Sequence, residues 1–234
     1  MSERAGGVSR APFASFNLGD AVGDDAAAVQ ENRRRLAERL GAHPVYLRQV
    51  HGTRVVNLDA HRDAPIILEA DAALCTRPGM ACTVLVADCL PVLFAAGNGQ
   101  AVAAAHAGWR GLAGGVLEAT VAALADAAHC APSDLHAWLG PCIGPQAFEV
   151  GADVVQALGG DEAGDADFIP APRADGSPHW LANLPQLARA RLCAAGVKAI
   201  TGGTWCTVGE PEHFFSYRRD KTTGRLAAAV WLRE

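Results

Sequence analysis

The sequence predicts a mixed α/β domain, and three features support this prediction. Apolar runs of strand length occur at residues 81–87, 92–95 and 101–105, as expected for strands that are buried on both faces of a sheet. Stretches with helical periodicity and helix-capping residues lie before and after these runs. The 234 residues contain neither an internal repeat nor a low-complexity linker. We therefore interpret residues 1–234 as one domain, with residues 1–12 expected to be a disordered N-terminus.

The composition excludes several classes of protein. The formal net charge is −5 at pH 7, which argues against nucleic-acid binding because such proteins present a basic face. No apolar run approaches the ~18 residues needed to cross a bilayer. The first ten residues also lack the apolar core of a secretory signal. The seven cysteines form no CxxC pair, which favours reduced thiols. We expect a cytoplasmic protein without a membrane partner, either a monomer or a weak homo-oligomer.

The first predicted helix covers residues 24–40. Asp24 or Asp25 can cap its start, and Gly41 stands where a left-handed residue ends many helices. Arg33 falls on the same stripe as the apolar residues Val29 and Leu40. A buried arginine needs an anionic partner. That partner is either a structural carboxylate or an acidic group of a substrate, such as phosphate.

Strands are predicted next, at residues 44–50, 54–58, 81–87, 92–95 and 101–105. The segment from Asp88 to Pro91 interrupts the apolar run, and a kink or bulge is expected there because proline cannot donate a ladder hydrogen bond. The strand at 101–105 closes at His106. Residues 108–115 then lead into a helix that reaches about residue 128.

The second half continues in the same style. A strand at residues 138–139 enters the loop 140–145, and residues 150–158 are expected to form a helix. Residues 159–177 are rich in Gly, Asp and Pro and are predicted to be a surface loop. Asn183 and Pro185 begin a helix that Gly196 ends. Residues 214–218 and 226–232 are predicted to pair as a hairpin.

Three candidate metal ligands stand at the ends of predicted strands, namely His51, Cys89 and His106. Strand ends can converge in one cleft although these residues are far apart in sequence. One thiolate with two imidazoles suits Zn²⁺, and three protein ligands leave a coordination position free for water or substrate. The alternative is a core cysteine with two ordinary histidines, because a chain with 8 His and 7 Cys can contain such a triple by chance.

The surroundings of these residues resemble a known family. The segments QVHGTRV, ADCLPVLF, AHAGWRG and GPCIGP, with FNLGD near the start and FFSYRRDKTTGR near the end, are similar to the YfiH-type laccase-domain family. The match runs from about residue 13 to residue 231. The resemblance implies zinc on His51, Cys89 and His106. It also implies a four-layer α/β/β/α sandwich, phosphorolysis of adenosine, inosine and methylthioadenosine, and adenosine deamination.

Zinc-assisted deamination needs a group that carries a proton. Asp71 and Asp88 are the nearest carboxylates in sequence, and each could instead hold a ligand imidazole in place. We favour this supporting role for Asp71 and leave the role of Asp88 open. Cys89 is a ligand and also a candidate catalytic residue.

Several residues are candidates for binding phosphate or nucleoside. Besides Arg33, the family pattern places Asn17 near the site. Residues 108–115 with Arg110 form either an anion site at a helix start or a tight turn. One of Arg218 and Arg219 is expected to point inward, since they are consecutive on a predicted strand. Further residues are less favoured candidates, as purine-stacking rings or as a second thiol: Trp109, Phe148 and Cys142.

Three rival functions remain open. A copper-dependent polyphenol oxidase is suggested by the family's label, but a multicopper site needs about ten imidazoles, largely in H-x-H pairs, and no two histidines of this chain are separated by a single residue. Cu²⁺ could instead replace zinc. A metal-free hydrolase linked to cell-wall metabolism could use Cys89 as nucleophile and His106 as base. The third is a non-enzymatic binding protein.

Overall fold

Two sheets packed face to face form the frame of the protein. The structure is a computed structural model, and it describes residues 1–61, 68–161 and 163–233. The smaller of the two sheets has the strand order β13-β5-β1-β3, in which β1 is parallel to β5 and β3, and β13 is antiparallel to β5. Its strands are β1 (His43–Arg48), β3 (Leu68–Glu69), β5 (Met80–Val86) and β13 (Leu226–Trp231).

The larger sheet has six strands in the order β12-β8-β6-β7-β4-β2, with parallel and antiparallel pairs. Its strands are β2 (Val55–Asn57), β4 (Ala72–Cys75), β6 (Leu90–Ala96), β7 (Val102–Ala107), β8 (Leu135–Leu139) and β12 (Ala199–Gly202). All six residues of β7 are buried, as the continuous apolar run predicted. A core of apolar side chains, including Leu47, Val84 and Ala104, fills the space between the sheets.

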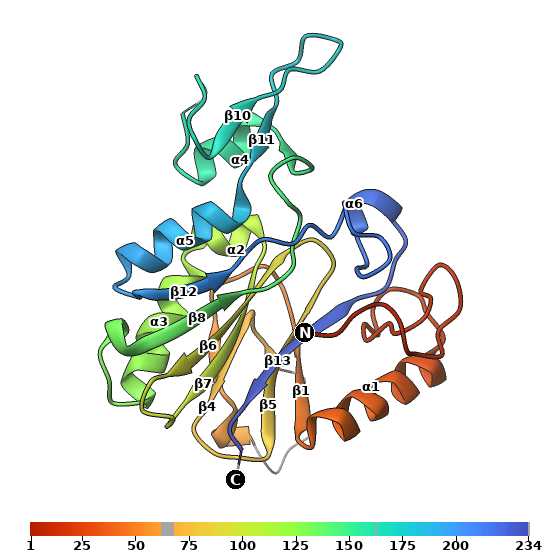
Figure 1. The fold of residues 1–234 in the computed structure, drawn as a ribbon, viewed down its shortest axis with the longest axis vertical. Helices are drawn as coiled ribbons and strands as arrows, with labels where there is room; N and C mark the ends of the chain where they lie inside the picture. The colour runs from red at the N-terminus through yellow and green to blue at the C-terminus, as the bar shows by residue number, and fades with distance from the viewer. Residues whose placement is uncertain (62–67, 162, 234) are drawn as a thin grey trace.

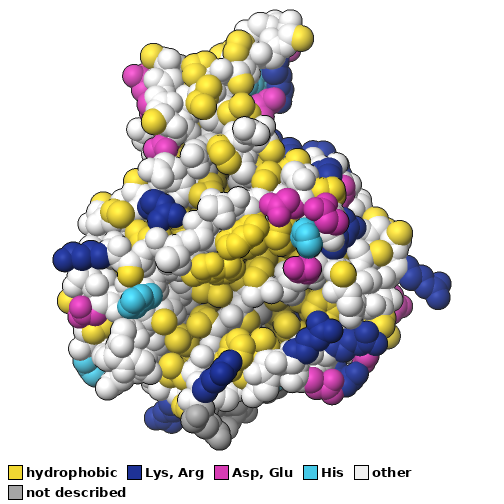
Figure 2. Space-filling view, viewed as in Figure 1, with side chains coloured by type: hydrophobic (Ala, Val, Ile, Leu, Met, Phe, Trp, Pro, Cys, Tyr) yellow, Lys and Arg dark blue, Asp and Glu magenta, His cyan; other side chains and the backbone are white. Residues whose placement is uncertain are grey.

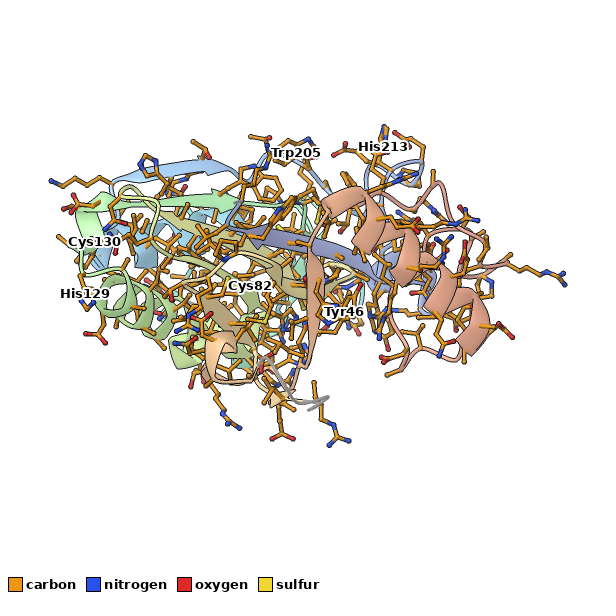
Figure 3. The ribbon with its side chains drawn as sticks, turned by 90° about the horizontal axis from the view of Figure 1, so that it is seen from below. Tyr46, Cys82, His129, Cys130, Trp205 and His213 are labelled. Atoms are coloured by element: carbon orange, nitrogen blue, oxygen red, sulfur yellow. The ribbon has the colours of Figure 1, made fainter. Side chains whose placement is uncertain are left out.

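Helices cover the outer face of each sheet (Figure 1). Helix α1 (Ala26–Leu40) packs on the four-stranded sheet through Leu36 and the core residues Phe16 and Leu18. Three helices pack on the six-stranded sheet: α2 (Trp109–Gly114), α3 (Val116–Ala127) and α5 (Leu184–Ala194). The order of layers is helix, sheet, sheet, helix, so the expected mixed α/β fold is confirmed. In Figure 3, Cys82 lies in the layer between the sheets and Tyr46 lies between β1 and α1.

A smaller unit projects beyond these layers, at the top of Figure 1. It contains the sheet β10-β11-β9 and a short helix. Its elements are β9 (Glu149–Val150), α4 (Ala152–Ala157), β10 (Phe168–Pro170) and β11 (Trp180–Ala182). The predicted helix at 150–158 is therefore shorter than expected, and the predicted loop at 159–177 contains β10. Residue 162 of that loop lies outside the described residues.

The predicted helix caps are present where the sequence places them. The Asp25 side chain accepts a hydrogen bond from the Ala28 N–H, which is worth about 1 kcal/mol at a helix start. Gly41 ends α1 with a φ of 63°, a conformation that costs glycine little. Asn183 caps α5 in the same way as Asp25 caps α1. The described residues also include two short 3₁₀ helices, at Leu58–His61 and Pro132–Asp134.

Two predictions about individual elements are wrong, and one short helix was not predicted. Residues 87–89 carry the chain from β5 in one sheet to β6 in the other, where a kink within one strand was expected. The helix predicted to follow residues 108–115 is present as α3, which begins after Gly115 (φ of 97°) and ends at Ala127, whereas the short helix α2 within the lead-in residues was not predicted. The expected hairpin is absent, because residues 217–220 form helix α6 (Tyr217–Asp220) and β13 pairs with β5 instead.

The N-terminal residues are attached to the rest of the protein, although disorder was expected there. The Ser2 N–H donates to the Ala227 carbonyl, and the Arg4 N–H donates to the His213 carbonyl. The Val8 N–H donates to the Asn32 side chain in α1. These bonds place residues 1–12 beside β13 and α1.

The face of the molecule shown in Figure 2 is not strongly basic, in line with the net negative charge. Acidic and basic side chains are interspersed over the face shown in Figure 2. Among the described residues, every helix is too short or too polar to cross a lipid bilayer.

Candidate metal centre

His51, Cys89 and His106 reach one point from three different elements. His51 follows the end of β1 in the four-stranded sheet, and His106 lies within β7 of the six-stranded sheet. Cys89 lies in the turn between β5 and β6. Two residues of these turns, His51 and Asp88, have positive φ angles of 60° and 94°. Such conformations cost energy for residues with a side chain, and they persist where the surrounding structure requires them.

The ligand atoms of these residues lie close enough to share one metal ion. All three atoms are within 4.8 Å of one another, and His51 Nε2 is 3.8 Å from Cys89 Sγ. Tetrahedral zinc with usual bond lengths places such a nitrogen and sulfur about 3.6 Å apart. Among the described residues this is the single group of three or more such side chains that could hold an ion. Donor chemistry and spacing therefore both fit a zinc-type site.

Asp71 holds two of the three ligands in position. Its buried carboxylate is 2.8 Å from His106 Nδ1 and accepts the backbone N–H of His51 at 2.9 Å. The N–H groups of Val50 and Gly52 also donate to it. Burial alone would raise the pKa of Asp71, but the hydrogen bonds from His106 and the backbone outweigh burial and lower it. The ionised carboxylate fixes the Nδ1–H tautomer of His106 and leaves Nε2 for the centre.

The three ligands also influence one another's charge. Burial would raise the pKa of Cys89, but the neighbouring His106 and His51 lower it to about 6. Burial would lower the pKa of His106, whereas the Cys89 thiolate and the Asp71 hydrogen bond raise it to about 9. Between these two values the protein without metal holds a thiolate beside an imidazolium. The thiolate is the form of cysteine that binds metals and attacks electrophiles.

Gly108 leaves the space that the ligands occupy. It precedes α2, and a Cβ atom on it would lie 2.8 Å from His51 Cδ2 and 3.0 Å from Cys89 Sγ. Its φ of −66° is accessible to any residue. The requirement for glycine in the AHAGWRG segment is therefore steric and comes from the metal centre.

The ligands line a cavity of about 990 Å³ that also extends along β1. This volume is at the upper end of the range for small-molecule sites. The charged side chains in its lining are Arg33, Arg48 and Arg225 with a single carboxylate, Asp20. Although the whole chain is acidic, this cavity is cationic. Neutral polar or aromatic groups in the lining include His43, Tyr46, Gln49 and Tyr217.

The comparisons with known proteins agree with this arrangement. The family model described as multi-copper polyphenol oxidoreductase laccase matches residues 1–233. The chain belongs to this family. Purine nucleoside phosphorylase YfiH of Escherichia coli is 50% identical over 234 residues, which cover 99% of this chain and 92% of the relative. A purine nucleoside phosphorylase of Pseudomonas aeruginosa is 50% identical over 236 residues, covering 100% of this chain and 93% of the relative.

Solved structures of this laccase-domain family share the fold. The crystal structure of a Neisseria meningitidis protein has a TM-score of 0.89 at 46% identity and covers 99% of this chain and 92% of its own. The structure of YlmD from Geobacillus stearothermophilus has a TM-score of 0.87 at 36% identity, covering 99% of this chain and 90% of its own. The resemblance inferred from the sequence motifs is therefore confirmed.

Four residues of this laccase-domain protein were expected to bind substrate, and Arg33 is the one of them that lines the cavity. Its Nη1 is 3.2 Å from the Asp20 carboxylate, and its Nε–H donates to the Leu18 carbonyl. Its guanidinium stacks on the Tyr46 ring at 4.0 Å. Of the two partners that the sequence left open, the structural carboxylate is present as Asp20, and substrate binding by Arg33 stays a prediction.

Asn17 has a structural position outside the cavity lining. Its buried side chain donates to the Gly19 carbonyl and to Asp24, and accepts the N–H groups of Gly19 and Arg225. Both N–H groups and the oxygen of the Asn17 amide are therefore occupied by protein groups. It joins the FNLGD segment to the start of β13.

Asp88 and the two adjacent arginines are also occupied by the protein. Asp88 accepts the Thr207 hydroxyl and the Arg218 N–H, both at 2.6 Å. The Arg218 guanidinium donates to the Ala147 and Glu149 carbonyls. Arg219 donates to three backbone carbonyls and pairs with Asp220. These residues tie together the loops behind Cys89 and do not line the cavity.

The remaining candidates lie away from the cavity lining. Arg110 is exposed and stacks on Trp109 at 4.1 Å, in a helix too short to form an anion site at its start. Phe148 is buried in the core beneath Arg218. Cys142 is buried beside Cys206, and burial raises the pKa of its thiol.

Sequence reasoning missed Arg225, Tyr46 and Tyr217 in the lining. Arg225 ends the segment KTTGR, so the terminal family motif was the signal that could have indicated it. Tyr46 and Tyr217 carried no comparable signal, because an aromatic residue on a strand or helix is usually core.

Proposed function

We propose that this chain is a metal-dependent purine nucleoside phosphorylase that acts on adenosine, inosine and methylthioadenosine. The observation that supports it best is the meeting of His51, Cys89 and His106 at the wall of a cationic cavity. In this reaction the bond between purine nitrogen and ribose C1′ breaks, and a phosphate oxygen forms the new bond to C1′. Two relatives of nearly the same length carry the name purine nucleoside phosphorylase.

Zinc is the metal that we assign to the centre. Bound there, it would supply a Lewis acid with one free coordination position. The residues contribute two neutral imidazoles and a thiolate, and Asp71 orients His106 through Nδ1. Cu²⁺ is the alternative metal, because it binds nitrogen and sulfur ligands more tightly than Zn²⁺ does. None of the seven cysteines forms a disulfide, as is usual for the cytoplasmic location that we propose.

In this proposal the side chains of the cavity attract the anionic reactant by their charge and hold the nucleoside by their shape. Arg33, Arg48 and Arg225 attract an anionic reactant such as phosphate into the cavity. The cavity walls hold the purine and ribose, with Tyr217 as an exposed ring at the lining. Adenosine deaminase activity is a side reaction in this proposal, because Asp71 and Asp88 already accept hydrogen bonds from the protein.

The test combines metal analysis with product analysis. Protein purified without added metal is expected to contain about one zinc per chain, and Cys89→Ala is expected to contain almost none. The wild-type enzyme should release adenine or hypoxanthine in phosphate buffer and stop when phosphate is replaced by an uncharged buffer. Equal zinc in both proteins, or base release that is independent of phosphate, would contradict the proposal.

A thiol hydrolase is the second candidate function. The lowered pKa of Cys89 beside the raised pKa of His106 favours it, because this is the charge state of a cysteine nucleophile with its base. Chelation and alkylation separate the two functions. A metal enzyme loses activity with a chelator and regains it with zinc, whereas a thiol hydrolase keeps its activity with the chelator and loses it with iodoacetamide.

A further inference from the structure

Arg225 is the more buried of the two cavity arginines that have no acidic partner among the described residues, the other being Arg48. Among the described residues, no carboxylate lies within ion-pairing distance of its guanidinium, whereas Arg33 is paired with Asp20. Its Nη1 donates hydrogen bonds of 3.2 Å to the carbonyls of Thr223 and Gly224. Arg225 is half-buried, so its charge is less screened than that of the exposed Arg48.

The backbone of Arg225 is fixed by the FNLGD segment from the other end of the chain. Its N–H donates to the Asn17 side chain at 2.8 Å, and its carbonyl accepts the Leu18 N–H at 3.1 Å. Its aliphatic stem lies against Gly19, where a Cβ atom would come within 2.6 Å of Arg225 Cγ. A charged group held in this way is already in place before a ligand binds, which reduces the entropy lost on binding.

Arg225 lines the same cavity as the metal ligands. Arg225 and Cys89 both line the cavity, and the charge of Arg225 interacts with Cys89. A planar guanidinium with free N–H groups is suited to two-point binding of a tetrahedral oxyanion. From this geometry we infer that Arg225 binds inorganic phosphate beside the metal centre, and that Asn17 and Gly19 position it. This inference rests on the proposed phosphorylase function and assigns its phosphate site.

The first test measures the KM for phosphate in Arg225→Gln and Arg225→Lys at saturating nucleoside. Loss of a charge-assisted pair of hydrogen bonds is expected to raise the KM for phosphate on the order of 10- to 100-fold in Arg225→Gln. The lysine variant should be affected less, since it keeps the charge without the planar fork. The KM for nucleoside should stay within about threefold. Arg110→Gln, which removes an exposed arginine outside the cavity, should behave like the wild type.

A second variant tests the positioning role without removing the charge. In Gly19→Ala the new methyl group displaces the Arg225 stem, so the KM for phosphate should rise while zinc content stays at one per chain. Its circular dichroism spectrum should match that of the wild type. Unchanged KM for phosphate in Arg225→Gln would overturn the inference, and unchanged KM in Gly19→Ala would overturn the role of Gly19.

A binding measurement separates this inference from the proposed function. Phosphate added to the zinc-loaded protein without nucleoside should raise the Tm of the wild type and Arg110→Gln, but not that of Arg225→Gln. If the wild type released no base from nucleosides, the phosphorylase function would fail, yet a Tm shift that depends on Arg225 would still support the phosphate site. An equal shift in all variants, or none in the wild type, would overturn it.

Discussion

The Asp71 carboxylate receives four N–H groups, three from the backbone of residues 50–52 and one from the His106 ring. A buried carboxylate is stable only with such partners, because its desolvation costs several kcal/mol. The same bonds hold the chain at His51 in its positive-φ conformation. One side chain therefore stabilises a strained turn and sets the tautomer of a ligand, which explains how the centre can be preformed.

The charge of Cys89 gives a prediction for the protein without metal. Its pKa is lowered to about 6, so the thiolate persists above that pH and is lost as the pH falls through about 6. Alkylation of Cys89 by iodoacetamide after zinc removal should therefore reach half its maximal rate near pH 6. An unperturbed cysteine would do so near pH 8.5. The rate can be followed by mass spectrometry of the peptide, with the exposed Cys193 as an internal reference.

Two outcomes bear on that prediction. In His106→Asn the midpoint should move toward the ordinary value, because the neighbouring imidazolium is the main opposing charge. A midpoint near pH 8.5 in the wild type would show that the two side chains do not form the ion pair described above.

Among the elements, those with local signals were predictable and those set by distant partners were not. The caps of α1 depend on Asp25 and Gly41 alone, so their residue types indicated them directly. Helix α6 is preceded by Ser216, whose hydroxyl accepts the Arg219 N–H as a helix cap. Residues 214–218 were predicted to be a hairpin strand instead. Pairing of β13 with β5, more than 130 residues earlier in the chain, has no local signature.

In the candidate site, too, some features were predictable from local sequence and others depend on distant partners. The ligands were predictable, because His51, Cys89 and His106 each stand at a strand end within a distinctive segment. The partners of Asp88 and Arg218 were not, since they are backbone groups and hydroxyls brought together by loops. An arginine looks the same in sequence whether it faces a ligand or a carbonyl, so only the fold distinguishes Arg225 from Arg218.

Gly108, at the junction between β7 and α2, gives a testable prediction. In Gly108→Ala the new Cβ overlaps His51 and Cys89, while the φ of −66° imposes no backbone strain. Zinc content should fall well below one per chain, and the Tm without metal should change by only a few degrees. Elemental analysis and calorimetry of the same preparation check this. Gly99→Ala is the control, because its φ of 73° strains the backbone at a turn where the new Cβ meets no atom within 4 Å, so full zinc content there would show that backbone strain alone does not empty the centre. Full zinc occupancy in Gly108→Ala would contradict the steric argument.

For the molecule as a whole, the centre lies where the two sheets meet. One ligand follows β1 of the four-stranded sheet, one lies in β7 of the six-stranded sheet, and Cys89 occupies the turn between them. The chain ends meet nearby, through Asn17 and Arg225. The layered architecture was predictable from the family resemblance. The distribution of the ligands over both sheets was not, because the sequence placed residues 81–95 in one interrupted strand.

A metal bound across two sheets should stabilise the whole fold. An ion that binds only the folded state adds about 2.7 kcal/mol to the free energy of unfolding when its free concentration is about 100 times its Kd. For a chain of this length that corresponds to a rise in Tm of about 5–10 °C. Calorimetry of the wild type with excess zinc and with a chelator should show this difference. In Cys89→Ala the two Tm values should converge, because one of the three ligands is missing. A zinc-independent Tm in the wild type would mean that the ligands do not hold the sheets together through a common ion.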